Sequence, residues 1–264
     1  MDTTFIIKVL ISFVVGGLWV VITTVSADRF GTKIGGLIAG LPSTLLFGLL
    51  FIGWTQNPVA SVQATTLVPI ISGINALFLF SYILLTRKGF YFALFVSLVS
   101  WLVLSLLMIL TKFNNFWILV IIYICIYGVV LYLIENKLKI TSSKGKKIQY
   151  SKKQIVLRGL LCGVMVSFSV ICGKLGGSIL GGVSAMFPAM FISTLIISYI
   201  TQGLEFSLGM AKSSMAGALS IVIFAVVVRY TFVPFGLIVG ILLAISTSLL
   251  NSYLVYRFIV KKLS

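Results

Sequence analysis

Few polar side chains lie inside the apolar runs of this 264-residue chain, and the most suggestive of them flank two prolines. Ser43 and Thr44 follow Pro42, and Ser184 stands four positions before Pro188. A proline inside a helix removes a backbone hydrogen bond, and a nearby hydroxyl can either satisfy the backbone or bind a solute. Non-covalent binding of a small polar molecule is therefore the chemistry that these residues suit.

The two prolines belong to a stretch that the sequence contains twice. Residues 31–56, GTKIGGLIAGLPSTLLFGLLFIGWTQ, align without a gap on residues 177–202, GSILGGVSAMFPAMFISTLIISYITQ. The shared features are a Gly-Gly pair, a proline six residues after it, and a Thr-Gln end. Because the identities fall on special residues rather than on common aliphatic ones, they indicate an ancient duplication with an offset of 146 residues.

The composition is that of a membrane protein with many spans. Hydrophobic residues make up 60% of the chain and charged residues 9%, and the mean hydropathy is +1.21. Soluble domains have roughly 45–50% apolar and 25% charged residues. Apolar runs of about 20 residues can cross the bilayer core as helices. Nine are predicted, at residues 5–27, 32–55, 61–85, 89–111, 116–135, 154–173, 177–201, 207–228 and 233–257.

The positive charge predicts the orientation. The loop 136–153 is rich in lysine, and placing it in the cytoplasm leaves sixteen of the 20 Lys and Arg residues inside and four outside. Because cytoplasmic loops retain Lys and Arg, we expect a multi-pass protein of the cell membrane with an external N-terminus and a cytoplasmic C-terminus. The net charge of +16 is thus explained without nucleic acid, and the loop is expected to contact anionic lipid headgroups of the bilayer.

The fold predicted from these spans is an all-α membrane bundle of nine transmembrane helices. Spans 1 to 4 correspond to spans 6 to 9, five crossings later, so the two units must run through the membrane in opposite directions. The expected divisions are a first four-helix unit (1–112), a connector helix (113–135), the basic loop (136–153) and a second four-helix unit (154–264). Inverted repeats of this kind are found in many secondary transporters.

Two interpretations of the Gly-Gly and proline motif remain open. Small residues let helices pack tightly, whereas a break at matching depth in two repeats is typical of a central solute site. The second interpretation, extended to a buried amide in the third span, gives ten candidate substrate-binding residues: Gly35, Gly36, Pro42, Ser43, Thr44, Asn75, Gly181, Gly182, Ser184 and Pro188.

Several chemistries lack their residues. The chain has no histidine, its three cysteines have no ligand-like spacing, and none of its four acidic residues lies at mid-span. We therefore expect neither catalysis nor a metal or other cofactor. Asp28 and Glu205 are expected to form interfacial salt bridges with Arg29 or Lys212, and the Lys212 side chain is expected to extend to the cytoplasmic interface.

The runs IAGLPSTLLFGLLFIG (38–53) and GGVSAMFPAMFISTLIISYI (181–200) resemble the GlpM-like small integral membrane proteins. Those proteins carry a similar run of small residues, proline and apolar residues. The resemblance covers about 25 residues in each half of the chain. It implies no substrate and no functional residue.

The sequence favours a secondary transporter or facilitator for a small neutral or anionic solute, with its site between the breaks at Pro42 and Pro188. The scarcity of mid-span carboxylates argues against a metal cation as the solute. The alternatives are a lipid-handling protein of the flippase type and a membrane scaffold that transports nothing. Glycine faces that pack against a partner are also compatible with a homo-oligomer.

Overall fold

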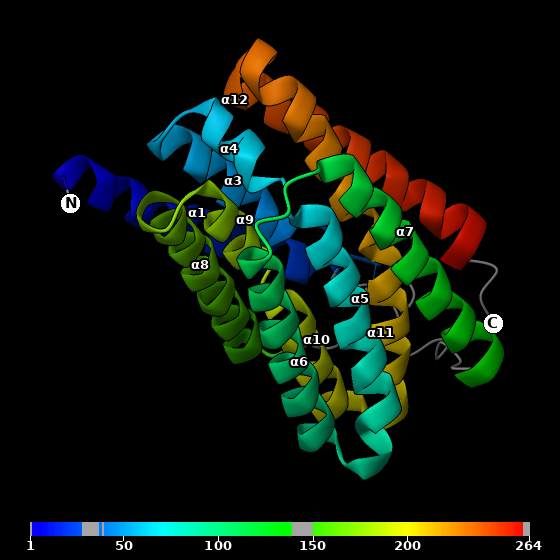
Figure 1. The fold of residues 1–264 in the computed structure, drawn as a ribbon. Coiled ribbons are helices and arrows are strands. Elements are labelled where there is room, and N and C mark those ends of the chain that lie inside the picture. Colours follow the sequence, from blue (N-terminus) through cyan, green and yellow to red (C-terminus); the bar gives the residue numbers. More distant parts are fainter. Residues whose placement is uncertain (1, 28–36, 39, 139–149, 261–264) are drawn as a thin grey trace.

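Residues 2–27, 37–38, 40–138 and 150–260 are described in the computed structural model of the chain, and they form helices without any strand (Figure 1). Short 3-10 or π turns follow three of the helices, at Thr86–Lys88, Leu133–Leu138 and Tyr256–Val260. The α-helices are α1 (Thr3–Ala27), α3 (Ser43–Thr55), α4 (Pro58–Ala64), α5 (Val68–Leu85), α6 (Phe90–Leu110), α7 (Phe116–Tyr132), α8 (Lys152–Leu175), α9 (Ser178–Ala185), α10 (Ala189–Gln202), α11 (Leu204–Gly217) and α12 (Leu219–Val255).

The outer surface is that of a membrane protein. Seven helical segments among the described residues are long and apolar enough to cross a bilayer. Helices α1, α6, α7 and α12 expose large apolar side chains along much of their length, which only a lipid environment or a partner surface can cover. The prediction of a multi-pass helical membrane protein is therefore confirmed.

Helix α5 lies at the centre of the bundle. It packs against α6, α7, α11 and α12, and most of its side chains are buried. Helix α1 crosses α8, while α6 and α7 lie on the outside of the arrangement (Figure 1). The centre of the protein is thus enclosed by α3, α5, α9, α10 and α11, and these elements carry the predicted breaks.

Polar residues begin several of the helices. The Asn57 side chain accepts a hydrogen bond from the Ala60 N–H at the start of α4, and Asn115 accepts from Ile118 N–H at the start of α7. Ser151 and Gln154 form a reciprocal capping box on α8. Such caps satisfy the free N–H groups of a first helical turn, so the sequence marks these helix starts locally.

One predicted span boundary is wrong. The predicted spans 207–228 and 233–257 leave a gap at 229–232, but α12 continues through this gap and turns back only at Gly236 (φ 77°, ψ 172°). The Thr231 hydroxyl lies 3.5 Å from the Gly240 carbonyl oxygen, and that of Ser248 lies 3.3 Å from the Ser220 oxygen, so the two halves run antiparallel.

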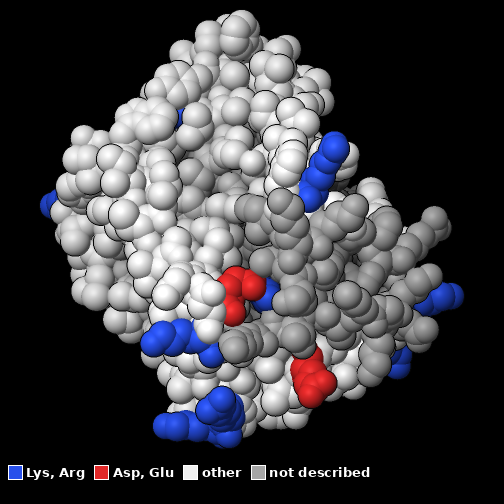
Figure 2. Space-filling view, turned by 90° about the vertical axis from the view of Figure 1, so that its right-hand side faces the viewer, with Lys and Arg blue, Asp and Glu red and all other residues white. Residues whose placement is uncertain are grey.

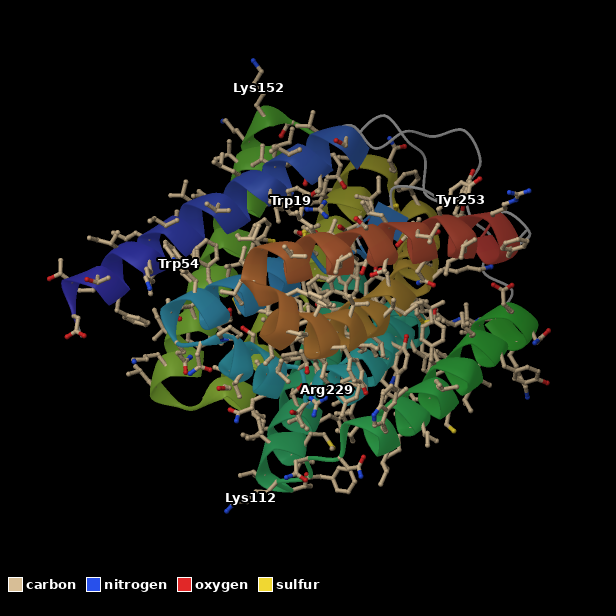
Figure 3. All side chains as sticks on the ribbon, turned by 90° about the horizontal axis from the view of Figure 1, so that it is seen from above. Trp19, Trp54, Lys112, Lys152, Arg229 and Tyr253 are labelled. Atoms are coloured by element: carbon tan, nitrogen blue, oxygen red, sulfur yellow. The ribbon has the colours of Figure 1, made fainter. Side chains whose placement is uncertain are left out.

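The physical reason is that polar side chains inside α12 have partners. Arg229 donates to the Val62 carbonyl oxygen at 3.3 Å, and Thr231 donates to the Val227 oxygen at 2.7 Å. The chain therefore turns where a positive φ requires glycine, not where polarity rises. Arg229 lies within the bundle, whereas Lys112 and Lys152 project from its edges (Figure 3).

Charged side chains are unevenly distributed over the surface. Figure 2 shows a face that is uncharged over most of its area, with Asp and Glu lying among Lys and Arg in its lower half, around residues that the structure does not describe. Most of the predicted basic loop, together with Asp28, Arg29, Gly35 and Gly36, lies outside the described residues.

The second Gly-Gly pair packs against two neighbouring helices. A Cβ atom on Gly181 would lie 2.7 Å from the Gly173 Cα of α8, and one on Gly182 would collide with the carbonyl of Ala64 in α4. Both clashes are with backbone atoms, which cannot rotate away. The packing interpretation of the pair is therefore supported for Gly181 and Gly182.

Gly182→Leu should destabilise the protein by roughly 1–3 kcal/mol or more, because the new side chain must displace the α4 backbone. Thermal unfolding in detergent would measure this as a lower melting temperature. Gly128→Leu is the matched control, since no atom lies within 4 Å of its Cβ position. Equal melting temperatures for the two variants would contradict the packing described here.

Candidate functional site

The two prolines break the chain in the same way. Pro42 precedes α3 with φ −73° and ψ 45°, and Pro188 precedes α10 with φ −76° and ψ 38°. Both prolines are buried. Each break therefore stands inside the bundle and starts a new helix there.

The hydrogen bonds around the breaks are also repeated at the offset of 146 residues. The N–H of Ser43 donates to the Leu41 oxygen at 2.7 Å, and the N–H of Ala189 donates to the Phe187 oxygen at 2.8 Å. Three further pairs of backbone hydrogen bonds match in the same way. With the N–H donor named first, they are Gly40–Leu37 and Met186–Val183, Leu41–Ile38 and Phe187–Ser184, and Leu46–Pro42 and Ile192–Pro188. The backbone on both sides of each break is thus mostly satisfied locally.

The match continues into the hairpins that follow. The Ser61 hydroxyl donates to the Leu49 carbonyl oxygen at 2.6 Å, and the Ser207 hydroxyl donates to the Leu195 oxygen at 3.1 Å. These serines are themselves 146 positions apart. The equivalence therefore extends without a gap beyond Gln56 and Gln202, at least to Ser61 and Ser207.

The two breaks meet at one small cavity of about 30 Å³. Besides Met186, its lining consists of residues that are paired at the same offset of 146 positions: Leu41 with Phe187, Pro42 with Pro188, Thr44 with Met190, Leu45 with Phe191, and Asn75 with Ile221. A cavity of this size holds about one water-sized group. It lies where the equivalent parts of the two halves face each other.

Two helix N-termini border this cavity. Neither α3 nor α10 has a side-chain cap at its first turn. The first N–H groups of a helix have no partner within the helix, and the helix dipole gives that end a partial positive charge. The cavity therefore favours a carbonyl, carboxylate or other electron-rich group.

Asn75 connects the cavity to α6 and to the second break. Its amide nitrogen lies 3.4 Å from the Met186 carbonyl oxygen, and its amide oxygen accepts a 2.7 Å hydrogen bond from the Trp101 indole N–H. Asn75 is 2% exposed. The Trp101 ring packs edge-on against Phe187, with 5.5 Å between the ring centroids. Trp101 was missed in the sequence because its only signal is an indole N–H that needs a buried partner.

The structure brings together four of the ten predicted site residues: Pro42, Thr44, Asn75 and Pro188 line the cavity. Ser43 and Ser184 line two neighbouring cavities. Gly181 and Gly182 pack against other helices, and Gly35 and Gly36 lie outside the described residues.

The two neighbouring cavities flank the central one and differ in size. One, of about 20 Å³, shares Leu41 and Pro42 with the central cavity, and the other, of about 200 Å³, shares Phe187 with it. Three pairs of their lining residues stand 146 positions apart: Trp19 with Met165, Leu41 with Phe187, and Leu102 with Ser248. The cavities at these equivalent places thus differ in volume, about 20 Å³ against about 200 Å³.

Two basic residues that the charge count assigns to the cytoplasmic side are buried. Lys212 is 2% exposed and forms a 2.8 Å salt bridge with Glu135, so the prediction that its side chain extends to the interface is wrong. Arg158, which lies in the predicted span 154–173 and is one of the sixteen residues counted as cytoplasmic, is 3% exposed and donates to the hydroxyls of Tyr150 and Thr194. In both cases the partner comes from a distant segment that the local sequence does not reveal.

The described part of the chain offers no group of three His, Cys, Asp or Glu residues that could hold a metal ion. Cys125, Cys162 and Cys172 are free thiols. The chemistry available around the breaks is therefore that of hydroxyls, an amide, helix ends and one buried guanidinium.

Comparison with known proteins gives one match. Residues 9–114 match a family described as protein of unknown function (DUF3147). No curated protein and no solved structure matches the chain. The comparisons do not confirm the resemblance to GlpM-like proteins, and they bring no substrate or activity.

Asn75→Leu and Trp101→Phe should each destabilise the protein by about 1–3 kcal/mol, because each leaves the other's polar group buried without its partner. The double variant should lose clearly less than the sum of the two, because it removes both groups. Thermal or denaturant unfolding in detergent measures the three values. Strictly additive losses would contradict the hydrogen bond as the link between α5 and α6.

Proposed function

We propose that the protein is a secondary transporter or facilitator for a small neutral or anionic solute, which binds where the breaks at Pro42 and Pro188 meet. The observation that carries the proposal is the cavity lined by residues paired at 146 positions and bordered by two uncapped helix N-termini. Half-helix ends that point at a shared site are how many transporters bind solutes. The proposal involves no enzymatic step and no cofactor.

The proposed topology has nine crossings, in two inverted four-helix units joined by α7. Helix α3 has 13 residues, or about 20 Å, so it spans only part of the roughly 30 Å core and is half of a broken helix. Helix α12 supplies two crossings because it turns back at Gly236. The family match over 9–114 has nearly the bounds of the proposed first unit, 1–112, and so supports a division there, before a connector (113–135), the basic loop (136–153) and a second unit (154–264).

The crossing of α1 and α8 supports the inverted relation. A Cβ on Gly17 would lie 2.9 Å from the Gly159 oxygen, and one on Gly163 would lie 2.6 Å from the Phe13 oxygen. Gly163 stands 146 positions after Gly17, and Gly159 stands 146 positions after Phe13. Exchanging the two halves therefore converts the Gly17–Gly159 contact into the Gly163–Phe13 contact. The same contacts make α1 and α8 antiparallel. Both facts are expected of a pseudo-two-fold axis in the membrane plane.

The unequal flanking cavities suggest how a solute would reach the centre. In the proposed mechanism the approximately 200 Å³ cavity beside Phe187 is open while its approximately 20 Å³ counterpart beside Leu41 is closed. Rocking one unit against the other would exchange the two states, because equivalent positions line both cavities. The central site would then be reached from the two faces of the membrane in turn.

Uptake into proteoliposomes tests the proposal, with radiolabelled acetate, inorganic phosphate and glycerol as anionic and neutral probes. Saturable uptake of at least one probe is expected. Thr44→Leu should reduce it roughly tenfold or more, because it removes a hydroxyl and fills the cavity. Thr247→Leu is the control, since Thr247 bonds only to its own helix and lines none of the cavities described above.

A lipid-handling protein is the second candidate, because a cavity of about 370 Å³ between α1 and α8 is lined by apolar side chains and two glycines, as an acyl chain would require. Contact of the basic loop with anionic headgroups would fit this reading. Scrambling of fluorescent phospholipids in the same liposomes distinguishes it from solute transport. Absence of both scrambling and saturable uptake would overturn both proposals and leave a scaffold.

A further inference from the structure

Arg158 is a buried cation without a matching anion. Its guanidinium donates to the Tyr150 hydroxyl at 2.9 Å and to the Thr194 hydroxyl at 2.7 Å, and it lies 3.6 Å from the Met190 sulfur. The Nε atom is buried and has no hydrogen-bond partner. All these neighbours are uncharged, so nothing in this set balances the positive charge.

The described acidic residues do not compensate for it. Glu135 pairs with Lys212, and no described carboxylate lies within the 4.0 Å salt-bridge distance of Arg158. A charged side chain inside a membrane protein is costly unless it is paired, and removing one partner of a buried pair leaves a strongly unfavourable charge. Arg158 therefore stands where an anion would lower the free energy of the folded protein.

The first turns of α10 add to the positive potential at this place. Met190 and Thr194 lie in the first two turns of α10, whose N-terminus has no side-chain cap. The Thr194 hydroxyl accepts a hydrogen bond from Arg158, and no contact in the described structure uses its own hydrogen. A guanidinium, a free hydroxyl hydrogen and a positive helix end are the donors that a carboxylate or phosphate group requires.

Only one half of the protein has this feature. The positions equivalent to Arg158, Met190 and Thr194 are Ser12, Thr44 and Gly48, 146 residues earlier. Met190 also lines the central cavity, so the guanidinium is separated from the proposed solute site by a single flexible side chain. The duplication therefore supplies the cavity, and Arg158 adds a charge to one end of it.

We propose that Arg158, with Thr194 and the N-terminal end of α10, binds an oxyanion, namely the carboxylate or phosphate group of a small anionic solute or of a lipid. The central cavity holds only a water-sized group, so Met190 must move for the oxyanion to enter. That the bound oxyanion is the transported solute rests on the proposed function. The binding itself does not.

Thermal unfolding of the purified protein in a neutral detergent tests this site. Sodium acetate and sodium phosphate are titrated at constant ionic strength against sodium chloride. The expected result is a saturable rise in melting temperature with at least one oxyanion. In Arg158→Gln the affinity for the oxyanion should fall roughly tenfold to a hundredfold. The affinity of Arg158→Lys should lie between those of the wild type and Arg158→Gln, because lysine keeps the charge but not the planar fork of donors.

Lys152→Gln is the matched control, since it removes the same charge from an exposed position one and a half turns earlier on α8 and should leave the affinity unchanged. A structural role for Arg158 predicts that Arg158→Gln lowers the melting temperature without any anion. The proposal predicts little or no loss, because removing an unpaired buried charge offsets the loss of the hydrogen bonds to Tyr150 and Thr194. A second series in phosphatidylcholine nanodiscs, with and without phosphatidylglycerol, distinguishes a lipid headgroup from a soluble anion.

The proposal is overturned if neither oxyanion nor phosphatidylglycerol stabilises the wild-type protein, or if Arg158→Gln retains the full effect. Because the wild-type titration alone decides the first point, the test does not require the variant to fold. Oxyanion binding without uptake in proteoliposomes would remove the proposed function and keep this site. Uptake that Arg158→Gln leaves unchanged would keep the proposed function and overturn the claim that the oxyanion bound at Arg158 is the transported solute.

Discussion

The structure depends on one constraint: backbone polar groups inside a bilayer must find their hydrogen-bond partners within the protein. This constraint matters most where the two helices are broken. At Pro42 and Pro188 the chain satisfies most of these groups through short local bonds that recur at an offset of 146 residues. The amide of Asn75, held by Trp101, reaches one carbonyl of the second break. The first turns of α3 and α10 have no side-chain cap, and they border the cavity and give it its chemical character.

Residues paired at an offset of 146 positions and residues that differ between such pairs contribute different things to this site. The equivalent residues produce a cavity where the two halves meet, with matching helix ends on either side. The residues that differ give it polarity, since the counterpart of Asn75 is Ile221, that of Thr44 is Met190, and that of Arg158 is Ser12. A symmetric framework with asymmetric side chains can change shape between two similar states while holding a solute with one set of contacts.

The sequence predicted the features that depend on local backbone chemistry. The proline breaks and the buried role of Asn75 follow from what proline and an amide require in lipid, and the structure places Pro42, Pro188, Thr44 and Asn75 on one cavity. It could not predict features that depend on distant partners. The burial of Arg158 depends on Thr194 and Tyr150, and that of Lys212 depends on Glu135. The turn of α12 depends on the conformation of a single glycine, Gly236.

The most direct test of the central claim is whether a thiol in the cavity can be reached from the two sides of the membrane. In a variant whose three cysteines are replaced by alanine, Thr44→Cys would be exposed to a membrane-impermeant thiol reagent from each face in turn. Lys112→Cys and Lys152→Cys serve as references for the two faces, because the proposed topology places Lys112 outside and Lys152 in the cytoplasm. The account predicts slow labelling of Thr44→Cys from both faces and fast labelling of each reference from one. Labelling from a single face would contradict alternating access, and labelling from neither, while both references react, would contradict the central site.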